Sequence, residues 1–311
     1  MKIRKIIFLI LTVLFLYIIT ACSRVSTISG IPHVKEIPRA VADNQNAVPG
    51  EQQKDSTAED KVQEIGGVEQ EPDWAATGTE TKREETLSSE TYSFWYQLKD
   101  GRARTAEEIE KLLAKYNGIF AGPLQNILYL TFDLGYEAGY TAKILDILKE
   151  EDVKAAFFVT GDFVKKQPQL VKMMAAEGHI IGNHTETHPD LSSLAPEEIT
   201  KELKGVDRRL AALGLPATTF FRPPRGVFNE MVLKTAGDNG YRAVLWSFAY
   251  RDWLTDEQPG LDTARTTILK GAFPGSVLLL HGVSRSNSEV LGDVIRELKN
   301  RGYTFGTLNE L

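Results

Sequence analysis

Two histidines four residues apart, His184 and His188, are the residues of this 311-residue chain whose type and spacing most clearly suggest chemistry. Neutral imidazole is the commonest metal ligand of proteins, and two imidazoles at this spacing can face one ion. The chain has only five histidines, and a third, His281, closes a later apolar run. We interpret the pair as part of a metal site.

Polar residues with complementary chemistry stand at the ends of three other apolar runs. Asp133 closes the first run, Arg222 follows a later one, and His281 closes another. A carboxylate can act as a general base, an imidazole as a general acid, and a guanidinium can hold a carboxylate ionised. Together with a metal pair, these residues indicate a hydrolase.

The elements that must position these residues alternate along the chain after residue 125. Apolar runs predict strands at 127–132, 155–159, 180–183, 219–222, 243–247, 276–280 and 303–306. Helical patterns lie between them at 141–150, 168–177, 196–213, 229–239, 262–271 and 288–300. Such alternation implies parallel strands with crossover helices.

The fold class is therefore α/β, and seven units suggest a barrel somewhat smaller than the eight-unit TIM barrel. Asp133, His184, Arg222 and His281 each end or closely follow a predicted strand. In α/β barrels, catalytic groups gather at the carboxyl ends of the strands. We expect these four side chains to share one site.

Composition limits the classes of function. Apolar residues make up 42% of the chain and aromatic residues 9%, which is enough for a full core. The net charge of -6 argues against nucleic-acid binding, which needs a basic surface. The single cysteine, Cys22, excludes an intramolecular disulfide and a multi-cysteine metal site. We expect no nucleic-acid partner and a monomer.

The N-terminus resembles an export signal with a lipid site. Basic residues at 2, 4 and 5 precede an apolar run over 6–19, which is shorter than the roughly 20 residues of a membrane span. Ile19-Thr20-Ala21-Cys22 resembles the bacterial lipoprotein signal. Residues 1–21 are then a signal peptide, and lipidated Cys22 anchors an extracytoplasmic protein to the cell membrane. An ordinary signal peptide or an uncleaved short anchor is the alternative.

Residues 22–92 contain the lipidation site and a polar stretch that we predict to be a disordered tether. Positions 23–92 carry 14 acidic and 7 basic side chains, and apolar periodicity is lacking. Residues 93–125 form a helical lead-in, with a helix at 106–113 and Thr105 as its N-cap. The catalytic domain covers residues 126–311.

That last region resembles the polysaccharide deacetylase (NodB-homology) family, whose fold is a distorted (β/α)7 barrel. The resemblance rests on five motifs in order: Thr131-Phe132-Asp133, His184-Thr185-Glu186-Thr187-His188, Arg222-Pro223-Pro224-Arg225-Gly226, Asp252-Trp253 and Leu279-Leu280-His281-Gly282. The wording over 132–137 and 222–228 is similar to one branch. That branch contains the muramic δ-lactam-forming de-N-acetylases, which act on N-acetylmuramic acid in bacterial cell wall, notably spore cortex.

The resemblance implies a role for each motif residue. Asp133 would be the general base, and His281 would donate a proton to the leaving sugar amine. His184 and His188 would hold a divalent ion. Arg222 would orient Asp133 and keep it ionised.

Other residues near the motifs are assigned to support and substrate binding. Asp252 either supports the site or is only a surface acid. A backbone N–H near Arg225 would help to stabilise the oxyanion. Tyr136 and Trp253 either stack on sugars or pack in the core. Because arginine binds carboxylates in a bidentate manner, Arg225 or Arg285 would read the lactyl carboxylate of muramic acid.

The sequence departs from the family at the metal site. Most members have a second Asp after the base as the third metal ligand, and here that position is Leu134. The muramic branch also lacks this Asp, so activity is not excluded. Two protein ligands should bind a catalytic zinc more weakly than three. Glu137 or Glu186 could compensate. Zinc is the expected ion, but Leu134 leaves its identity open.

These observations predict a metal-dependent de-N-acetylase of N-acetylmuramic acid in peptidoglycan, whose product leads to muramic δ-lactam. Its partners would be peptidoglycan glycan strands and the membrane. One alternative is a deacetylase of N-acetylglucosamine in peptidoglycan or another β-1,4 glycan. Another is a non-catalytic wall-binding lipoprotein, although the retained base Asp133 and acid His281 argue against a pure binder.

Overall fold

The computed structural model describes residues 87–311. Its strands are β1 (Tyr92–Ser93), β2 (Gln97–Lys99), β3 (Arg102–Arg104), β4 (Ile127–Leu134), β5 (Ala156–Val159), β6 (Ile180–Asn183), β7 (Phe220–Phe221), β8 (Val227–Phe228), β9 (Arg242–Ala243), β10 (Val277–His281) and β11 (Thr304–Gly306). Its α-helices are α2 (Glu107–Lys115), α3 (Thr141–Glu150), α4 (Gly161–Lys166), α5 (Pro168–Ala176), α6 (Pro196–Ala212), α7 (Glu230–Asp238), α8 (Leu261–Gly271) and α9 (Arg285–Asn300). Three short 3-10 helices cover Leu191–Ser193, Pro224–Gly226 and Leu308–Glu310.

Seven strands form one parallel sheet in the order β10-β4-β5-β6-β7-β9, and β11 pairs with the first part of β4. These are the seven strands that the apolar runs predict, and the α/β fold class is confirmed. Because all seven run in the same direction, their carboxyl ends share one edge of the sheet. The register places His281 directly beside Asp133 at that edge.

The curled sheet is not closed by a continuous ladder between β9 and β10. A single parallel bridge joins Phe248 to Leu278, and the Leu279 N–H donates to the Phe248 carbonyl at 2.8 Å. The segment after α2 completes the seam, since Ile119 is paired with Val244 and Ala121 with Ser276. The lead-in is thus part of the barrel wall.

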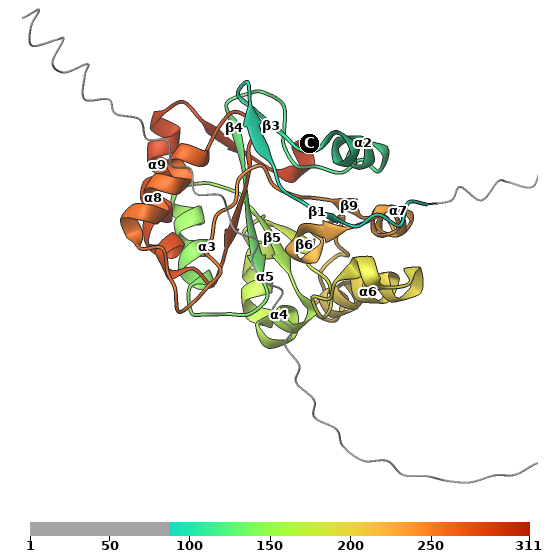
Figure 1. Cartoon of the computed structure of the whole chain (residues 1–311). Coiled ribbons are helices and arrows are strands. Elements are labelled where there is room, and N and C mark those ends of the chain that lie inside the picture. Colours follow the sequence, from blue (N-terminus) through green and yellow to red (C-terminus); the bar gives the residue numbers. More distant parts are fainter. Residues whose placement is uncertain (1–86) are drawn as a thin grey trace, which may run out of the picture. The chain divides into compact units, whose positions relative to one another are not determined.

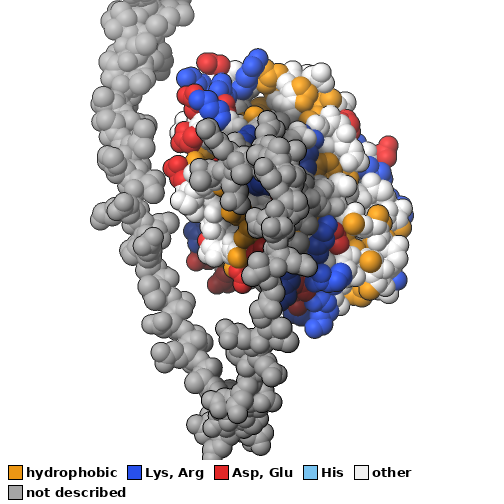
Figure 2. All heavy atoms as spheres, turned by 90° about the vertical axis from the view of Figure 1, so that its right-hand side faces the viewer, with side chains coloured by type: hydrophobic (Ala, Val, Ile, Leu, Met, Phe, Trp, Pro, Cys, Tyr) orange, Lys and Arg blue, Asp and Glu red, His pale blue; other side chains and the backbone are white. Residues whose placement is uncertain are grey.

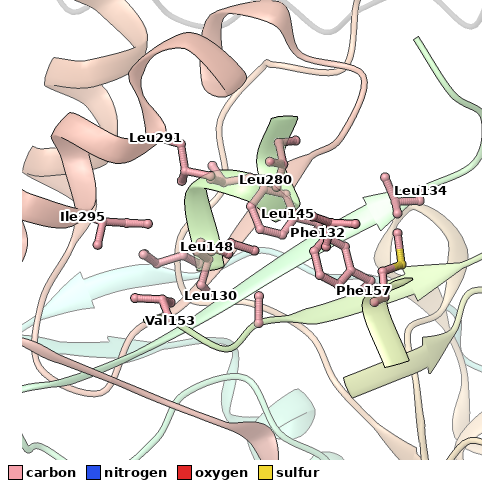
Figure 3. Packing of buried hydrophobic residues seen from close by; sticks show 14 of the residues in the cluster. Leu130, Phe132, Leu134, Leu145, Leu148, Val153, Phe157, Leu280, Leu291 and Ile295 are labelled. Carbon is pink, nitrogen blue, oxygen red and sulfur yellow. The ribbon is translucent and has the colours of Figure 1, made fainter. Parts of the chain in front are cut away.

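The larger core lies between the sheet and its covering helices. Figure 3 shows Leu130, Phe132 and Leu134 of β4 in one buried cluster with side chains from α3, α9 and β5. Phe132 and Phe157 stack with ring centroids 5.2 Å apart. Continuous apolar runs of this kind are typical of parallel strands that are covered on both faces. This packing fixes β4, the strand that carries Asp133.

Helices cover the sheet in two groups. α3, α8 and α9 lie together near β10 and β4, whereas α6 and α7 lie together near β6 and β9 (Figure 1). On the face that Figure 2 presents, acidic and basic side chains are interspersed. None of the helices within residues 87–311 is long and apolar enough to cross a membrane.

The structure differs from the predicted elements in a few places. Helix α4 and the antiparallel hairpin of β2 and β3 were not predicted, because each is too short to show a period. The predicted lead-in helix is confirmed, but Thr105 is not its N-cap. Ala106 occupies that position, and the Thr105 hydroxyl donates to the Trp95 carbonyl instead. The predicted signal peptide, lipidated Cys22 and most of the tether lie outside the described residues.

Candidate active site

Asp133 and Arg222 form a buried ion pair at the carboxyl edge of the sheet. Arg222 Nη1 lies 2.6 Å from Asp133 Oδ1. Three further guanidinium protons are also used, since Nε donates to the Val244 carbonyl and Nη2 to Thr131 Oγ1 and the Leu245 carbonyl. The guanidinium stacks over the Phe158 ring at 4.1 Å. Arg222 is therefore fixed in one orientation, and with it the carboxylate of Asp133.

The electrostatics of this pair favour an ionised base. Burial by itself raises the pKa of Asp133, but the charge and hydrogen bond of Arg222, together with the nearby His184 and His281 rings, outweigh it and lower that pKa below the ordinary value. Burial lowers the pKa of Arg222, and the pairing with Asp133 opposes that effect. Asp133 is thus ionised near neutral pH in the resting site and is able to accept a proton.

His184 and His188 lie next to each other at the end of β6, with ring centroids 4.8 Å apart. His184 Nδ1 lies 2.9 Å from the Arg222 carbonyl, and because a carbonyl only accepts, Nδ1 carries the proton. The lone pair of Nε2 then faces the site, 3.5 Å from Asp133 Oδ2. Burial lowers the pKa of both histidines, that of His188 to about 4. Neutral imidazoles of this kind are suited to ligate a metal ion.

Backbone conformation marks the same place. Thr185, His188 and Arg225 have φ values of 68°, 61° and 57°. The left-handed region is unfavourable for β-branched Thr185 and for Arg225, whereas His188 and the other non-glycine residues with positive φ in residues 87–311, all Asp or Asn, are of types that adopt it more often. Strained residues of this kind cluster at functional sites.

Helix α6 holds the histidine loop in its strained conformation. The Glu202 carboxylate accepts from both the backbone N–H and the hydroxyl of Thr187, at 2.8 Å each. Arg209 forms an ion pair with Glu186, whose side chain packs against Gly161 and Gly205. A Cβ at either glycine would overlap Glu186, so both must lack one. Contacts with α6 therefore hold the loop in this conformation.

His281 and Asp252 form the second carboxylate pair of the site. His281 Nδ1 lies 2.7 Å from Asp252 Oδ1, and Oδ2 of the same fully buried carboxylate accepts the His281 backbone N–H at 2.9 Å. Burial would lower the pKa of His281, but the hydrogen bond and charge of Asp252, aided by Asp133, raise it above the ordinary value. The protonated form of His281 is thus favoured. Asp252 is a buried partner of His281 and not a surface acid.

Asn287 in the first turn of α9 completes this network and was missed by the sequence reasoning. Its Nδ2 donates to Asp252 Oδ2 at 2.5 Å, and its Oδ1 accepts from the Tyr250 hydroxyl. Because an ionised carboxylate only accepts, the NH2 end of the amide must face Asp252, which leaves its oxygen for the Tyr250 hydroxyl. An amide on a helix after the fifth motif carries no local sequence signal of such a role.

The donor set at the histidine pair fits a divalent ion bound through two imidazoles. Within residues 87–311, no cluster of three or more His, Cys, Asp or Glu side chains is arranged to bind a metal. Leu134 is fully buried in the core against Gly282. Glu137 accepts from the Gly139 and Thr141 backbone at the start of α3. Since Glu186 pairs with Arg209, neither of the glutamates proposed as substitutes is available as a third ligand.

The catalytic groups line one cavity of about 790 Å3. Asp133, His184 and His281 face it, as their positions at strand ends predict, and so does His188. Arg222, the fourth residue expected at the site, is fully buried and is joined to the site through its ion pair with Asp133. Tyr136, Trp253 and Arg225 also line it, and Trp253 lies 5.6 Å from the His281 ring between centroids. Tyr136 and Trp253 are about half exposed, so they are not core residues.

One predicted substrate residue lies elsewhere. Arg285 is the exposed first residue of α9 and is not among the residues that line the cavity. In contrast, Ser93, Phe94 and Trp95 from the lead-in do line it. Pairing of β1 with β8 brings them there. No local pattern indicates this, because residues 93–95 are distant in sequence from every motif.

Comparison with known proteins identifies relatives of this fold and site. The polysaccharide deacetylase family matches residues 121–244. The peptidoglycan-N-acetylmuramic acid deacetylase PdaA of Bacillus subtilis is 46% identical over 207 residues, which cover 66% of this chain and 79% of that protein. A peptidoglycan-N-acetylglucosamine deacetylase of Bacillus cereus is 38% identical over 199 residues, 62% of this chain and 71% of that protein.

A solved structure agrees with the observed fold. The structure of Bacillus subtilis PdaA, described as a family 4 carbohydrate esterase, superimposes with a TM-score of 0.70 and 42% sequence identity. The match covers 72% of this chain and 98% of that one.

Proposed function

The chain belongs to the polysaccharide deacetylase family, and from this we propose that it removes the N-acetyl group of N-acetylmuramic acid in peptidoglycan. One observation carries the proposal: an ionised base, Asp133, and a protonated acid, His281, face the same cavity as a pair of neutral histidines. The similarity to PdaA supports the muramic substrate.

The reaction is hydrolysis of the acetamide. A water molecule attacks the carbonyl carbon while Asp133 accepts its proton, and Arg222 holds the carboxylate toward the cavity. His281 then donates its proton to the departing nitrogen, so that the C–N bond breaks and acetate and the free sugar amine leave. Asp252 stabilises the imidazolium and orients its ring.

His184 and His188 would hold the divalent ion. When bound, such an ion supplies positive charge that polarises the acetamide carbonyl and acidifies water. The carbonyl of Arg222 orients His184, and Glu202 fixes the loop between the two histidines. Two protein ligands leave several positions open to water and substrate oxygens.

Arg225 is the candidate reader of the lactyl carboxylate, which N-acetylglucosamine lacks. It lines the cavity and its side chain is 60% exposed, with Asp190 3.6 Å away. The planar guanidinium can bind a carboxylate through two hydrogen bonds. Attack of the freed amine on that carboxyl group, with loss of water, would give the muramic δ-lactam.

A second candidate substrate is N-acetylglucosamine, because the Bacillus cereus relative acts on it by name. The same residues would catalyse the same hydrolysis, and only the contact of Arg225 would differ. For location, the sequence supports a lipid anchor at Cys22 and an extracytoplasmic site of action.

The test is incubation of the protein with peptide-free glycan strands, metal-free and with zinc or another divalent ion. Mass analysis of the digested glycan separates muramic lactam and free muramic amine from free glucosamine. Metal-dependent acetate release from muramic units, abolished in Asp133→Asn, is expected. Acetate from glucosamine units alone would favour the second candidate. Binding without any acetate release would indicate a wall-binding protein.

Arg225→Ala tests the reading of the lactyl group, with Arg285→Ala as the matched control outside the cavity. Arg225→Ala should reduce the rate on muramic units and leave the rate on glucosamine units unchanged. Arg285→Ala should change neither. An unaltered preference in Arg225→Ala would contradict this assignment.

A further inference from the structure

Every exposed aromatic side chain in residues 87–311 lines the catalytic cavity. Trp95, Tyr136 and Trp253 are 59%, 51% and 47% exposed, and they come from three separate segments. The other large exposed apolar side chains of this region are leucines and a methionine, and none of them lines the cavity. Exposed aromatic rings that gather around one cavity indicate a ligand with apolar faces.

Trp95 is the one of the three that the family motifs do not account for. Its neighbour Phe94 is buried, with its ring edge-on to Trp246 at 5.5 Å and its N–H bonded to the Gly226 carbonyl at 2.9 Å. On the other side, the Trp95 carbonyl accepts from Thr105 at 2.8 Å. The backbone is therefore fixed while the indole stays open, so little entropy is lost when a ligand covers it.

A glycan strand must continue beyond the sugar that reacts. The catalytic groups lie on strands β4 and β10 and on the loop after β6, whereas Trp95 reaches the cavity from the lead-in. A volume of about 790 Å3 is in the upper part of the usual range for ligand sites, about 300–1,000 Å3. A strand that extends from the catalytic groups toward the lead-in brings its neighbouring sugars to Trp95.

We propose that Trp95 forms a sugar-binding subsite for a second sugar of the same glycan strand. This inference rests on the proposed function. The face of the indole would cover the C–H face of a pyranose ring. This contact involves no charge, and it would not distinguish sugars by their acetyl or lactyl groups. The subsite would favour long strands over short ones and would leave the choice between muramic and glucosamine units to other residues.

The experiment compares strand lengths in the full-length protein. kcat/KM is measured on long peptide-free glycan strands and on the shortest oligosaccharide that the wild type converts. Trp95→Ala should lose roughly tenfold on long strands, through KM, with little change on the short substrate. Trp95→Tyr should restore most of the loss. Leu98→Ala, exposed nearby but outside the cavity, is the matched control and should behave as wild type.

Equal losses on long and short substrates, or no loss on long ones, would overturn the subsite. Calorimetric binding of long strands to Asp133→Asn, with and without Trp95→Ala, separates it from the proposed function. If the wild type releases no acetate but Trp95→Ala weakens binding, the proposed function fails and the subsite stands. If Trp95→Ala leaves binding unchanged while acetate is released, the subsite fails and the proposed function stands.

Discussion

The two sides of the cavity use the same kinds of side chain with opposite results. On one side, Asp133 pairs with a buried guanidinium and is kept ionised, and the adjacent His184 has a lowered pKa. On the other side, Asp252 pairs with His281 and raises its pKa. Burial and neighbouring positive charge favour the neutral form of His184, which we propose as a ligand, whereas the bond to a buried carboxylate favours the protonated form of His281, which we propose as the acid. Surroundings, more than residue type, assign the role.

Among substitutions that test this comparison, Arg222→Met should have the largest effect on activity and stability. It leaves the buried carboxylate of Asp133 without its partner, so the pKa of Asp133 should rise and stability should fall by roughly 3–5 kcal/mol. Acetate release and thermal unfolding measure the two effects. Arg222→Lys, which keeps the charge but not the planar fork, should recover part of the stability. Wild-type stability in Arg222→Met would contradict the role of the pair.

On the acid side, Asp252→Asn should reduce the rate roughly hundredfold. His281 works as an acid only when protonated, so activity is lost as pH rises through its pKa. Because Asp252 raises that pKa, the variant should lose activity at lower pH than the wild type does. The pH profile of kcat/KM measures the shift. An unmoved basic limb would show that Asp252 does not control the proton of His281.

A smaller effect is expected for Asn287→Leu, which removes one of the three hydrogen bonds to Asp252. The rate should fall roughly tenfold, but the basic limb should not move to lower pH, because the charge of Asp252 remains. Ser288→Ala on the same helical turn is the control, since its hydroxyl bonds only to the Arg285 carbonyl in this structure. A downward shift like that of Asp252→Asn would mean that Asn287 acts through the charge and not through orientation.

The smallest effect concerns His179, a buried histidine at the opposite end of β6. Burial, with a contribution from Lys154, lowers its pKa to about 4, although Glu177 lies 3.8 Å away. The unfolded chain binds this proton more tightly, so stability is full above pH 6.5 and falls as pH drops toward 4. Between pH 7 and pH 5, the free energy of unfolding of His179→Gln should fall by about 1–2 kcal/mol less than that of the wild type, as measured by urea unfolding. An unchanged slope would show that other groups set the acid sensitivity.

Much of the fold follows from local patterns. Continuous apolar runs such as the one in β4 are typical of parallel strands covered on both faces, and the helical periods between them indicate crossovers. This order places Asp133, His184, Arg222 and His281 at one edge of the sheet. The short elements α4, β2 and β3 could not be predicted, because a turn or two of chain carries no period.

The sequence by itself determined the family motifs and the position of the site residues at strand ends, and from these the chemistry of base, ligand pair and acid is proposed. Only the tertiary structure decided that Asp252 is the buried partner of His281, that Asn287 orients it, that Glu137 and Glu186 are engaged elsewhere, and that Trp95 reaches the cavity while Arg285 does not. Residues at the carboxyl ends of neighbouring parallel strands lie close together because these ends share one edge of the sheet. Contacts between loops and helix ends depend on long-range packing, for which neighbouring residues in the sequence give no signal.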